Sequence, residues 1–239
     1  MKINNEQRKL LRKRAKYLMS TIVKDMMHDS RHINRTLEIA KQIYKSINKQ
    51  ADWDLIEQTV LWHDISRINN QGTGILMFYF DDLLSVKIVK TEFKKLNIDD
   101  YFTRKVCKLI MEHRLYSRGG KTLAGQIVRD ADKIDMYSPE RYDIATACVV
   151  DGLSKRNYFV RDFVVMGMNI YLFLCMVIYR RTSRALNYPA SRKIYYSTLK
   201  DLLKYFNHVK NTDKIIFKFI KRRIKKRIHD EIKIVLKLI

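Results

Sequence analysis

The stretch TVLWHDISR, residues 59–67, is the most informative part of this sequence for its fold. Its apolar start ends in the adjacent pair His63-Asp64, and an imidazole and a carboxylate are both accepted as ligands by divalent metals. Neighbouring side chains on a helix point about 100° apart, so the two reach one ion only where the helix ends. The Ile-Ser-Arg of residues 65–67 and the Asn- and Gly-containing residues 69–72 supply such an end. A lone His-Asp pair is more often a buried histidine capped by its neighbour, so a metal site requires further candidate ligands.

A second histidine precedes this pair, at the start of a helix predicted over residues 31–49. Ser30 is a candidate N-cap, and apolar residues recur at helical spacing from residue 33 to residue 47. His32 comes one residue before this stripe. Arg35 lies on the same side of the helix, where it could reach an anion that a metal holds.

A cluster of acids follows downstream, in the otherwise apolar stretch 123–135. Asp130, Asp132 and Asp135 lie within six residues, and carboxylates are costly to bury unless a cation pairs with them. The candidate ligands therefore occur in the order His32, His63-Asp64 and Ala131-Asp132, each on a predicted helix.

These motifs resemble those of the HD-domain metal-dependent phosphohydrolase superfamily. The sequence is most similar to the small bacterial-type branch that opens with His-Asp-x-x-His-x-x-Arg and closes with Gln-Ile-Val-x-Asp-Ala-Asp-x-x-Asp. Here HDSRHINR, residues 28–35, and QIVRDADKID, residues 126–135, match these two motifs. Glu-His-Arg, residues 112–114, matches the family's intermediate His-Arg element, and the resemblance covers roughly residues 24–145.

The resemblance implies an all-α HD fold with a metal site. The family's ligands fall on His32, His63, Asp64 and Asp132. Asp132 is preferred to Asp130 because the acid after Ala is the family's ligand. The implied cofactor is one divalent ion, Mn²⁺, Mg²⁺ or Fe²⁺, which activates a water molecule for attack on phosphorus.

The same resemblance implies roles for nearby residues. Asp64, His113 and Lys133 are expected to take part in catalysis, and Arg35, Lys133, His113 and Arg114 are expected to bind the substrate's phosphates. The implied activity is hydrolysis of phosphate ester or anhydride bonds in nucleotides or related compounds.

Two departures from the family pattern bear on mechanism. Relatives often have Ile-Gly and then acids after the His-Asp, whereas Ile-Ser-Arg follows here, which leaves the general base unassigned. The Glu-Asp pair of the branch that hydrolyses guanosine tetraphosphate is also absent, which argues against that substrate.

His113 is the one histidine between Asp64 and Asp132, which favours a mononuclear site.

The composition fits one all-α domain over residues 1–239, with an HD core at about 24–145 and a C-terminal helical extension at about 146–239. Only 2 Pro and 7 Gly occur, as expected of long helices. The run at residues 75–80 is the one β-like segment, although an aromatic core segment or a loop over the site fits equally well. Helices are expected at roughly 5–24, 31–49, 52–65, 80–96, 99–115, 122–137, 140–153, 159–181, 190–208 and 212–237.

Cysteine usage and hydropathy indicate a cytoplasmic protein. The three cysteines are far apart and form no Cys-x-x-Cys, which suggests a reduced chain, and the N-terminus lacks the apolar region of a secretory signal. The apolar segment 163–179 is at the lower length limit for a membrane span. A core helix is the favoured interpretation, and no transmembrane span is expected.

The net charge of +23 is high for an enzyme of small molecules and is concentrated in the first and last helices. The last helix reads as basic and amphipathic, so it could pack on the core, lie on an anionic membrane or approach nucleic acid. The charge makes a metal-dependent nuclease or (cyclic) oligonucleotide phosphodiesterase the main alternative function. A non-catalytic protein that binds nucleic acid or membranes on an HD fold is a second alternative.

Overall fold

The computed structural model describes residues 3–21, 30–48, 51–69, 77–112, 121–141, 185–208 and 215–239. These residues form helices and contain no strand, which confirms the all-α prediction. The chain divides into two compact units, Met1–Asp132 and Lys133–Ile239. The single domain with a core at 24–145 and an extension from 146 stays a prediction.

The first unit contains most of the described helices, and each α-helix overlaps a range predicted from sequence. They are α1 (Asn5–Ser20), α2 (Ser30–Ser46), α3 (Trp53–Trp62), the 3₁₀ helix η2 (Ile65–Asn69), α4 (Met77–Lys95), α5 (Asp100–Glu112) and α6 (Leu123–Asp135), the last of which continues into the second unit. Helices predicted at 140–153 and 159–181 lie outside the described residues, apart from 140–141.

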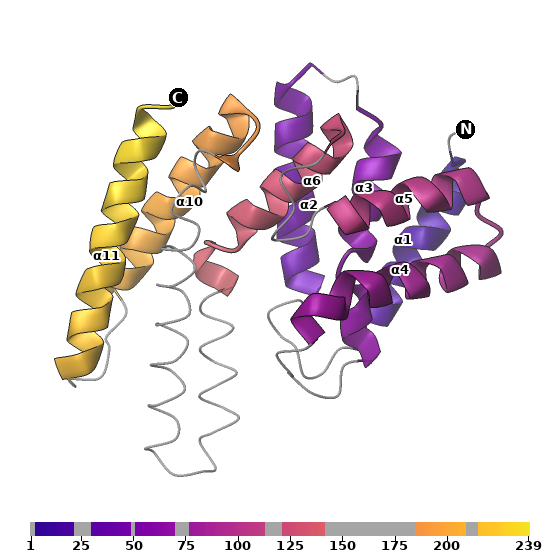
Figure 1. Cartoon of the computed structure of the whole chain (residues 1–239), viewed down its shortest axis with the longest axis horizontal. Coiled ribbons are helices and arrows are strands. Elements are labelled where there is room, and N and C mark those ends of the chain that lie inside the picture. The colour runs from indigo at the N-terminus through magenta and orange to yellow at the C-terminus, as the bar shows by residue number, and fades with distance from the viewer. Residues whose placement is uncertain are drawn as a thin grey trace, which may run out of the picture. The chain divides into compact units, whose positions relative to one another are not determined.

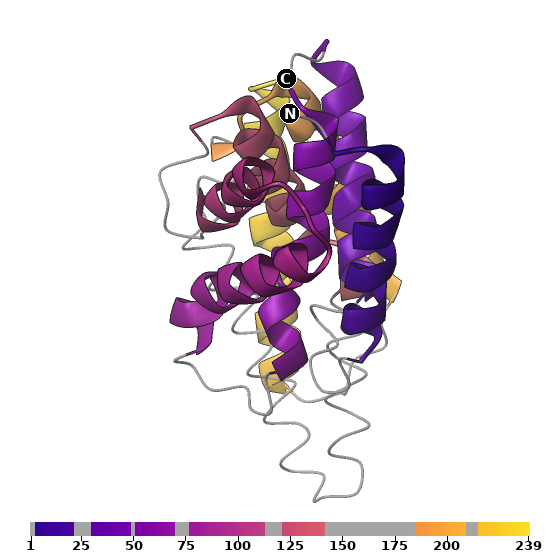
Figure 2. The same cartoon turned by 90° about the vertical axis from the view of Figure 1, so that its right-hand side faces the viewer.

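Helix α3 is the centre of the first unit. Every residue from Asp54 to Trp62 is buried, and a helix that is covered on all sides is a core helix. Trp62 packs edge-to-face on Phe93 of α4, with ring centroids 5.2 Å apart. Helices α1, α2 and α5 pack on α3, while α4 lies beside α5 and contacts η2 (Figures 1 and 2). This packing holds the carboxyl end of α3 in place.

The basic residues of α1 have a structural use that the sequence pattern did not show. Asp54 and Glu57 of α3 are buried, and a buried carboxylate needs a cationic partner. Helix α1 supplies both partners, in the ion pairs Arg8–Asp54 and Arg12–Glu57. A third arginine of α1 forms the ion pair Arg14–Glu92 with α4. Part of the positive charge on the first helix therefore stabilises the fold.

Three further sequence predictions can be compared with the structure. Residues 77–80 form the first turn of α4, so the β-like interpretation is wrong for them. Cys107 is buried and unbonded, and burial raises the pKa of its thiol; the other two cysteines lie outside the described residues. Among the helices the structure describes, none is long and apolar enough to cross a membrane, and segment 163–179 is not among those residues.

The second unit contains α10 (Pro189–His208) and α11 (Ile215–Leu236), which pack side by side (Figure 1). Tyr195 of α10 contacts Tyr137 edge-to-face, with ring centroids 5.2 Å apart. Ile224, Ile228 and Val235 of α11 are fully buried. Of the alternatives for the basic amphipathic helix, packing of its apolar face against protein is therefore confirmed at these three positions.

Candidate metal centre

His32 lies in the first turn of α2 and is completely buried. Thr36, one helical turn later, places its hydroxyl oxygen 3.4 Å from Nδ1 of this histidine. The contact orients the ring, and Nε2 faces His63 and the two aspartates. Orientation of a ligand histidine through its second nitrogen is typical of metal sites.

His63 and Asp64 lie where α3 ends, as the sequence predicted. The helix stops at Trp62, His63 is its C-cap, and η2 begins immediately after Asp64. The backbone N–H of Arg67 donates to the carbonyl oxygen of Asp64 at 3.1 Å, which tightens the turn. The Nδ1 of His63 lies 2.8 Å from the carbonyl oxygen of Val60, so Nδ1–H can donate to this oxygen and Nε2 is the nitrogen that would bind a metal.

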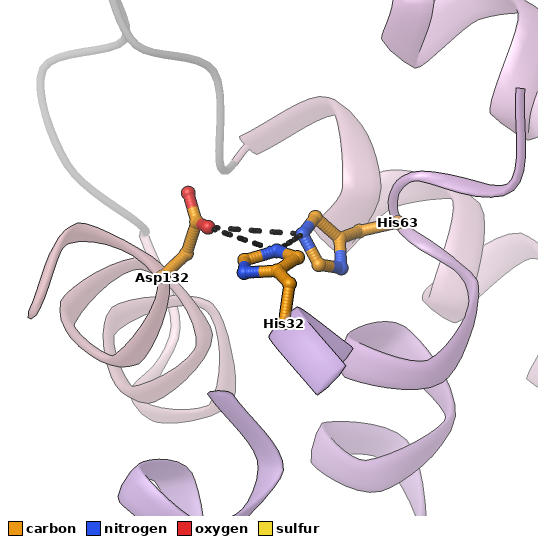
Figure 3. A group of neighbouring side chains, drawn as sticks. All are labelled: His32, His63 and Asp132. Atoms are coloured by element: carbon orange, nitrogen blue, oxygen red, sulfur yellow. Dashed lines mark hydrogen bonds and ion pairs between the residues drawn. The ribbon is translucent and has the colours of Figure 1, made fainter. Parts of the chain in front are cut away.

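Asp132 reaches the two histidines from α6 (Figure 3). Its Oδ1 lies 3.6 Å from Nε2 of His32 and 3.8 Å from Nε2 of His63, and the two Nε2 atoms are 3.4 Å apart. One ligand atom from each of the three residues lies within 4.8 Å of the others. Asp64 adds Oδ2 at 3.3 Å and 3.2 Å from the same two nitrogens. We call these four residues the His/Asp cluster.

The spacing of these atoms fits a shared ion. Ligands bound at roughly 2.0–2.2 Å in tetrahedral or octahedral geometry are about 3.0–3.6 Å from one another. Four of the five nitrogen–nitrogen and nitrogen–oxygen distances of the cluster, 3.2 to 3.6 Å, fall in this range, and the fifth, 3.8 Å between His63 and Asp132, lies just above it. Two imidazoles and a carboxylate form a mixed donor set that accepts hard and borderline divalent metals. His32, His63 and Asp132 could therefore hold one such ion, while Asp64 contacts both histidines but is not part of this three-residue group.

The charge balance of the cluster also favours a cation. Burial alone lowers the pKa of His63, but the charge of Asp64 and hydrogen bonds to Asp132 and Asp64 outweigh it, and the pKa lies well above 6.5. Without a metal, the carboxylates thus hold a proton on the imidazole. Because a metal must displace that proton, metal binding should weaken as the pH falls.

The remaining predicted site residues are placed as follows. Asp130 is fully buried and is not part of the three-residue group, whereas Asp132 is. Arg35 is half-buried on α2, one turn after His32, and Lys133 is buried on α6 in the second unit. His113 and Arg114 lie outside the described residues.

A buried polar network beside Asp64 was missed by sequence reasoning. Asp81 of α4 forms an ion pair with Arg67 of η2 and accepts a hydrogen bond from the hydroxyl of Ser66 at 3.3 Å. The backbone N–H of Ser66 donates to the hydroxyl of Ser85 at 3.1 Å. The carboxylate that pairs with Arg67 is thus supplied by α4. The network holds η2 in position directly after the His63-Asp64 turn.

Asp81 should make stability depend on pH. Burial raises its pKa from 3.8 to about 6, against the lowering effect of Arg67, and the charge of Asp64 adds to the rise. A raised carboxyl pKa contributes stability that is complete below the unfolded-state value and is lost as pH rises through the folded-state value. The stability of wild type relative to Asp81→Asn should therefore fall by up to about 3 kcal/mol between about pH 4 and about pH 7. Urea unfolding of both proteins in chelator measures this difference, and a pH-independent difference would contradict it.

Comparison with known proteins agrees with this geometry. Residues 30–137 match the family model of the HD domain, and this segment contains His32, His63, Asp64 and Asp132. No match was found among curated proteins or among solved structures. The match supports the HD-domain superfamily for this segment, while the assignment to the small bacterial-type branch stays a prediction.

Proposed function

We propose that this protein is a metal-dependent phosphohydrolase that acts on nucleotides or related phosphate esters and anhydrides. HD domains are typically metal-dependent hydrolases. The observation that carries the proposal is the convergence of the His/Asp cluster, whose nitrogen–nitrogen and nitrogen–oxygen distances are 3.2 to 3.8 Å. In this proposal His32, His63, Asp64 and Asp132 bind one divalent ion, Mn²⁺, Mg²⁺ or Fe²⁺.

The ligand side chains differ in exposure, which suggests the side from which substrate approaches. The side chains of His32 and His63 are 0% and 1% exposed, while those of Asp64 and Asp132 are 12% and 18% exposed. The imidazoles thus form the closed side of the cluster and the carboxylates its more open side. We place the scissile phosphate on the carboxylate side.

The proposed mechanism assigns each residue one task. When bound, the divalent ion would lower the pKa of a water molecule and neutralise charge on the attacked phosphate. Thr36 and the carbonyl group of Val60 orient the imidazoles, and the Arg67–Asp81 network holds the turn that carries Asp64. Asp64 orients the attacking water.

Cationic side chains complete the proposal. Arg35 is assigned to phosphate oxygens because it lies one turn from His32 on α2 and carries a bidentate donor group. Lys133, His113 and Arg114 are proposed to stabilise negative charge on the substrate, as the family motifs imply.

The first test is metal content with turnover. The purified protein should contain about one divalent metal per chain, and chelation should remove metal and activity together. His32→Ala should lose both, while His208→Ala, which changes an exposed histidine of α10, should lose neither. Elemental analysis and phosphate release measure these outcomes. Metal-free wild type with activity unaffected by chelator would refute the site.

The second test separates the alternatives by substrate. The net charge of +23 favours a nuclease or oligonucleotide phosphodiesterase as the second candidate, because both substrates are polyanions. Mononucleotides and short linear or cyclic oligonucleotides should be compared at equal phosphate concentration. Faster hydrolysis of mononucleotides supports the proposal, and faster hydrolysis of oligonucleotides supports the alternative. Bound metal without turnover on either class would indicate a non-catalytic protein.

A further inference from the structure

Helix α11 has two faces of opposite character. Among the side chains that the structure describes, from residue 221 onward, the buried positions are Ile224, Ile228, Glu231 and Val235. Five cationic residues are exposed there, and four of them share one face, which we call the basic stripe: Arg222, Lys226, Lys233 and Lys237. At 100° per residue each set spans about 60° of the helix, and the two sets are centred about 180° apart. The basic stripe therefore lies on the side of α11 opposite to its buried residues.

This arrangement argues against insertion into a membrane. An amphipathic helix that binds lipid does so by burying its apolar face in the acyl region. Among the described side chains of α11, Ile224, Ile228 and Val235 of that face are each 0% exposed, and the exposed apolar residues are Leu236 of the last turn and Leu238 and Ile239 after it. Between residues 222 and 235 the face that remains for a partner is therefore the cationic one.

The charges of the basic stripe are not used by the fold. Arg222, Lys226, Lys233 and Lys237 have no ion-pair partner within the part of the chain that the structure describes. In α1, by contrast, three arginines pair with buried or nearly buried acids of α3 and α4. Unpaired like charges on one face repel one another, so an anionic partner would gain from them.

The other described side chains of the unit extend the positive charge. Among its described side chains, eight lysines and arginines are exposed against two acids, Glu140 and Asp201. The exposed bases on α10 are Lys193, Lys200 and Lys204, and those on α11 are the basic stripe and Arg223. The partner should therefore be an extended polyanion rather than a single phosphate.

We propose that the basic stripe binds the phosphate backbone of nucleic acid. The four charges extend over about 22 Å of helix, long enough to contact several phosphates in succession. No Phe, Trp or Tyr is exposed among the described side chains of this unit, so these side chains offer phosphate contacts rather than stacking on bases. The affinity should accordingly depend on salt and be independent of base sequence. This surface is independent of the proposed hydrolase activity.

The test uses the full chain and labelled nucleic acid. Fluorescence anisotropy should follow binding of a single-stranded oligonucleotide of about 20 nucleotides and of the matching duplex. If four phosphates are contacted, wild-type affinity should fall about 50-fold for the single strand and about 150-fold for the duplex between about 50 and about 200 mM salt. In the variant Arg222→Gln/Lys226→Gln/Lys233→Gln/Lys237→Gln, low-salt affinity and salt dependence should both fall sharply.

A matched control removes the same charge elsewhere. Lys13→Gln/Lys16→Gln/Lys41→Gln/Lys45→Gln changes four exposed lysines of α1 and α2 and should retain binding and its salt dependence. Equal losses in both variants would show that only net charge matters and would overturn the proposal. Absence of binding by wild type at low salt would also overturn it. Binding to phosphatidylserine vesicles that depends on the stripe, without binding to nucleic acid, would assign the surface to membranes instead.

Discussion

Asp132→Ala is expected to abolish metal binding and turnover while the protein remains folded. Its Oδ1 faces both histidines, and its side chain is the more exposed of the two cluster carboxylates. Removal of an anionic ligand leaves the ion under-coordinated, and even loss of a residue that only supports a ligand typically costs 10–100-fold in affinity or activity. We therefore expect activity to fall by at least about 100-fold. Phosphate release and elemental analysis measure the two effects, and circular dichroism reports the helical fold.

Asp130→Ala is the matched control, because it removes the same group from the same helix. Asp130 is fully buried, so this variant should lose stability, but it should keep much more activity and metal per folded chain than Asp132→Ala. Asp64→Ala should resemble Asp132→Ala, because Oδ2 of Asp64 lies 3.3 Å and 3.2 Å from the two imidazole nitrogens. If Asp130→Ala were the inactive variant, the ligand would have been assigned to the wrong acid of the Asp-Ala-Asp.

The local parts of the site could be predicted from sequence. The end of α3 at His63-Asp64 follows from the residues beside it, since a helix must stop there for both side chains to face one point. The position of His32 in the first turn of α2 follows from the helical repeat of apolar residues after it. The contact between Thr36 and His32 also has a local signal, because the two residues are four apart on a helix.

Contacts between distant segments could not be predicted in this way. Asp81 pairs with Arg67 because α4 packs on η2, and no spacing within either segment encodes that packing. The sequence of α1 shows only a concentration of positive charge, because the acidic partners of its arginines lie in α3 and α4. The pattern of charges along a sequence does not show which cations form ion pairs and which are exposed to solvent. The burial of the acids that they contact does show it.

Removal of α11 is expected to have the largest effect on stability. Truncation before Lys214 deletes ten lysines and arginines and two acids, which lowers the net charge by eight. It also exposes the surface that packs against Ile224, Ile228 and Val235. Burial of one such side chain is worth about 1.5–3 kcal/mol, so these three contribute roughly 5–9 kcal/mol, comparable to the stability of a whole domain. The truncated protein should be insoluble or contain an unfolded second unit, as judged by yield and proteolysis.

Two substitutions separate the packing of α11 from its charge, which truncation removes together. Ile224→Asn/Ile228→Asn keeps every charge and should unfold or aggregate as the truncation does, because it buries two amide groups that have no hydrogen-bond partners. Neutralisation of the basic stripe changes only exposed positions and should leave solubility and unfolding free energy nearly unchanged. A soluble, folded truncation with unaltered binding to nucleic acid would contradict both assignments, because neither the buried face nor the basic stripe of α11 would then have a function. A soluble truncation that no longer binds nucleic acid would contradict the packing estimate alone, since the basic stripe would still have its proposed partner.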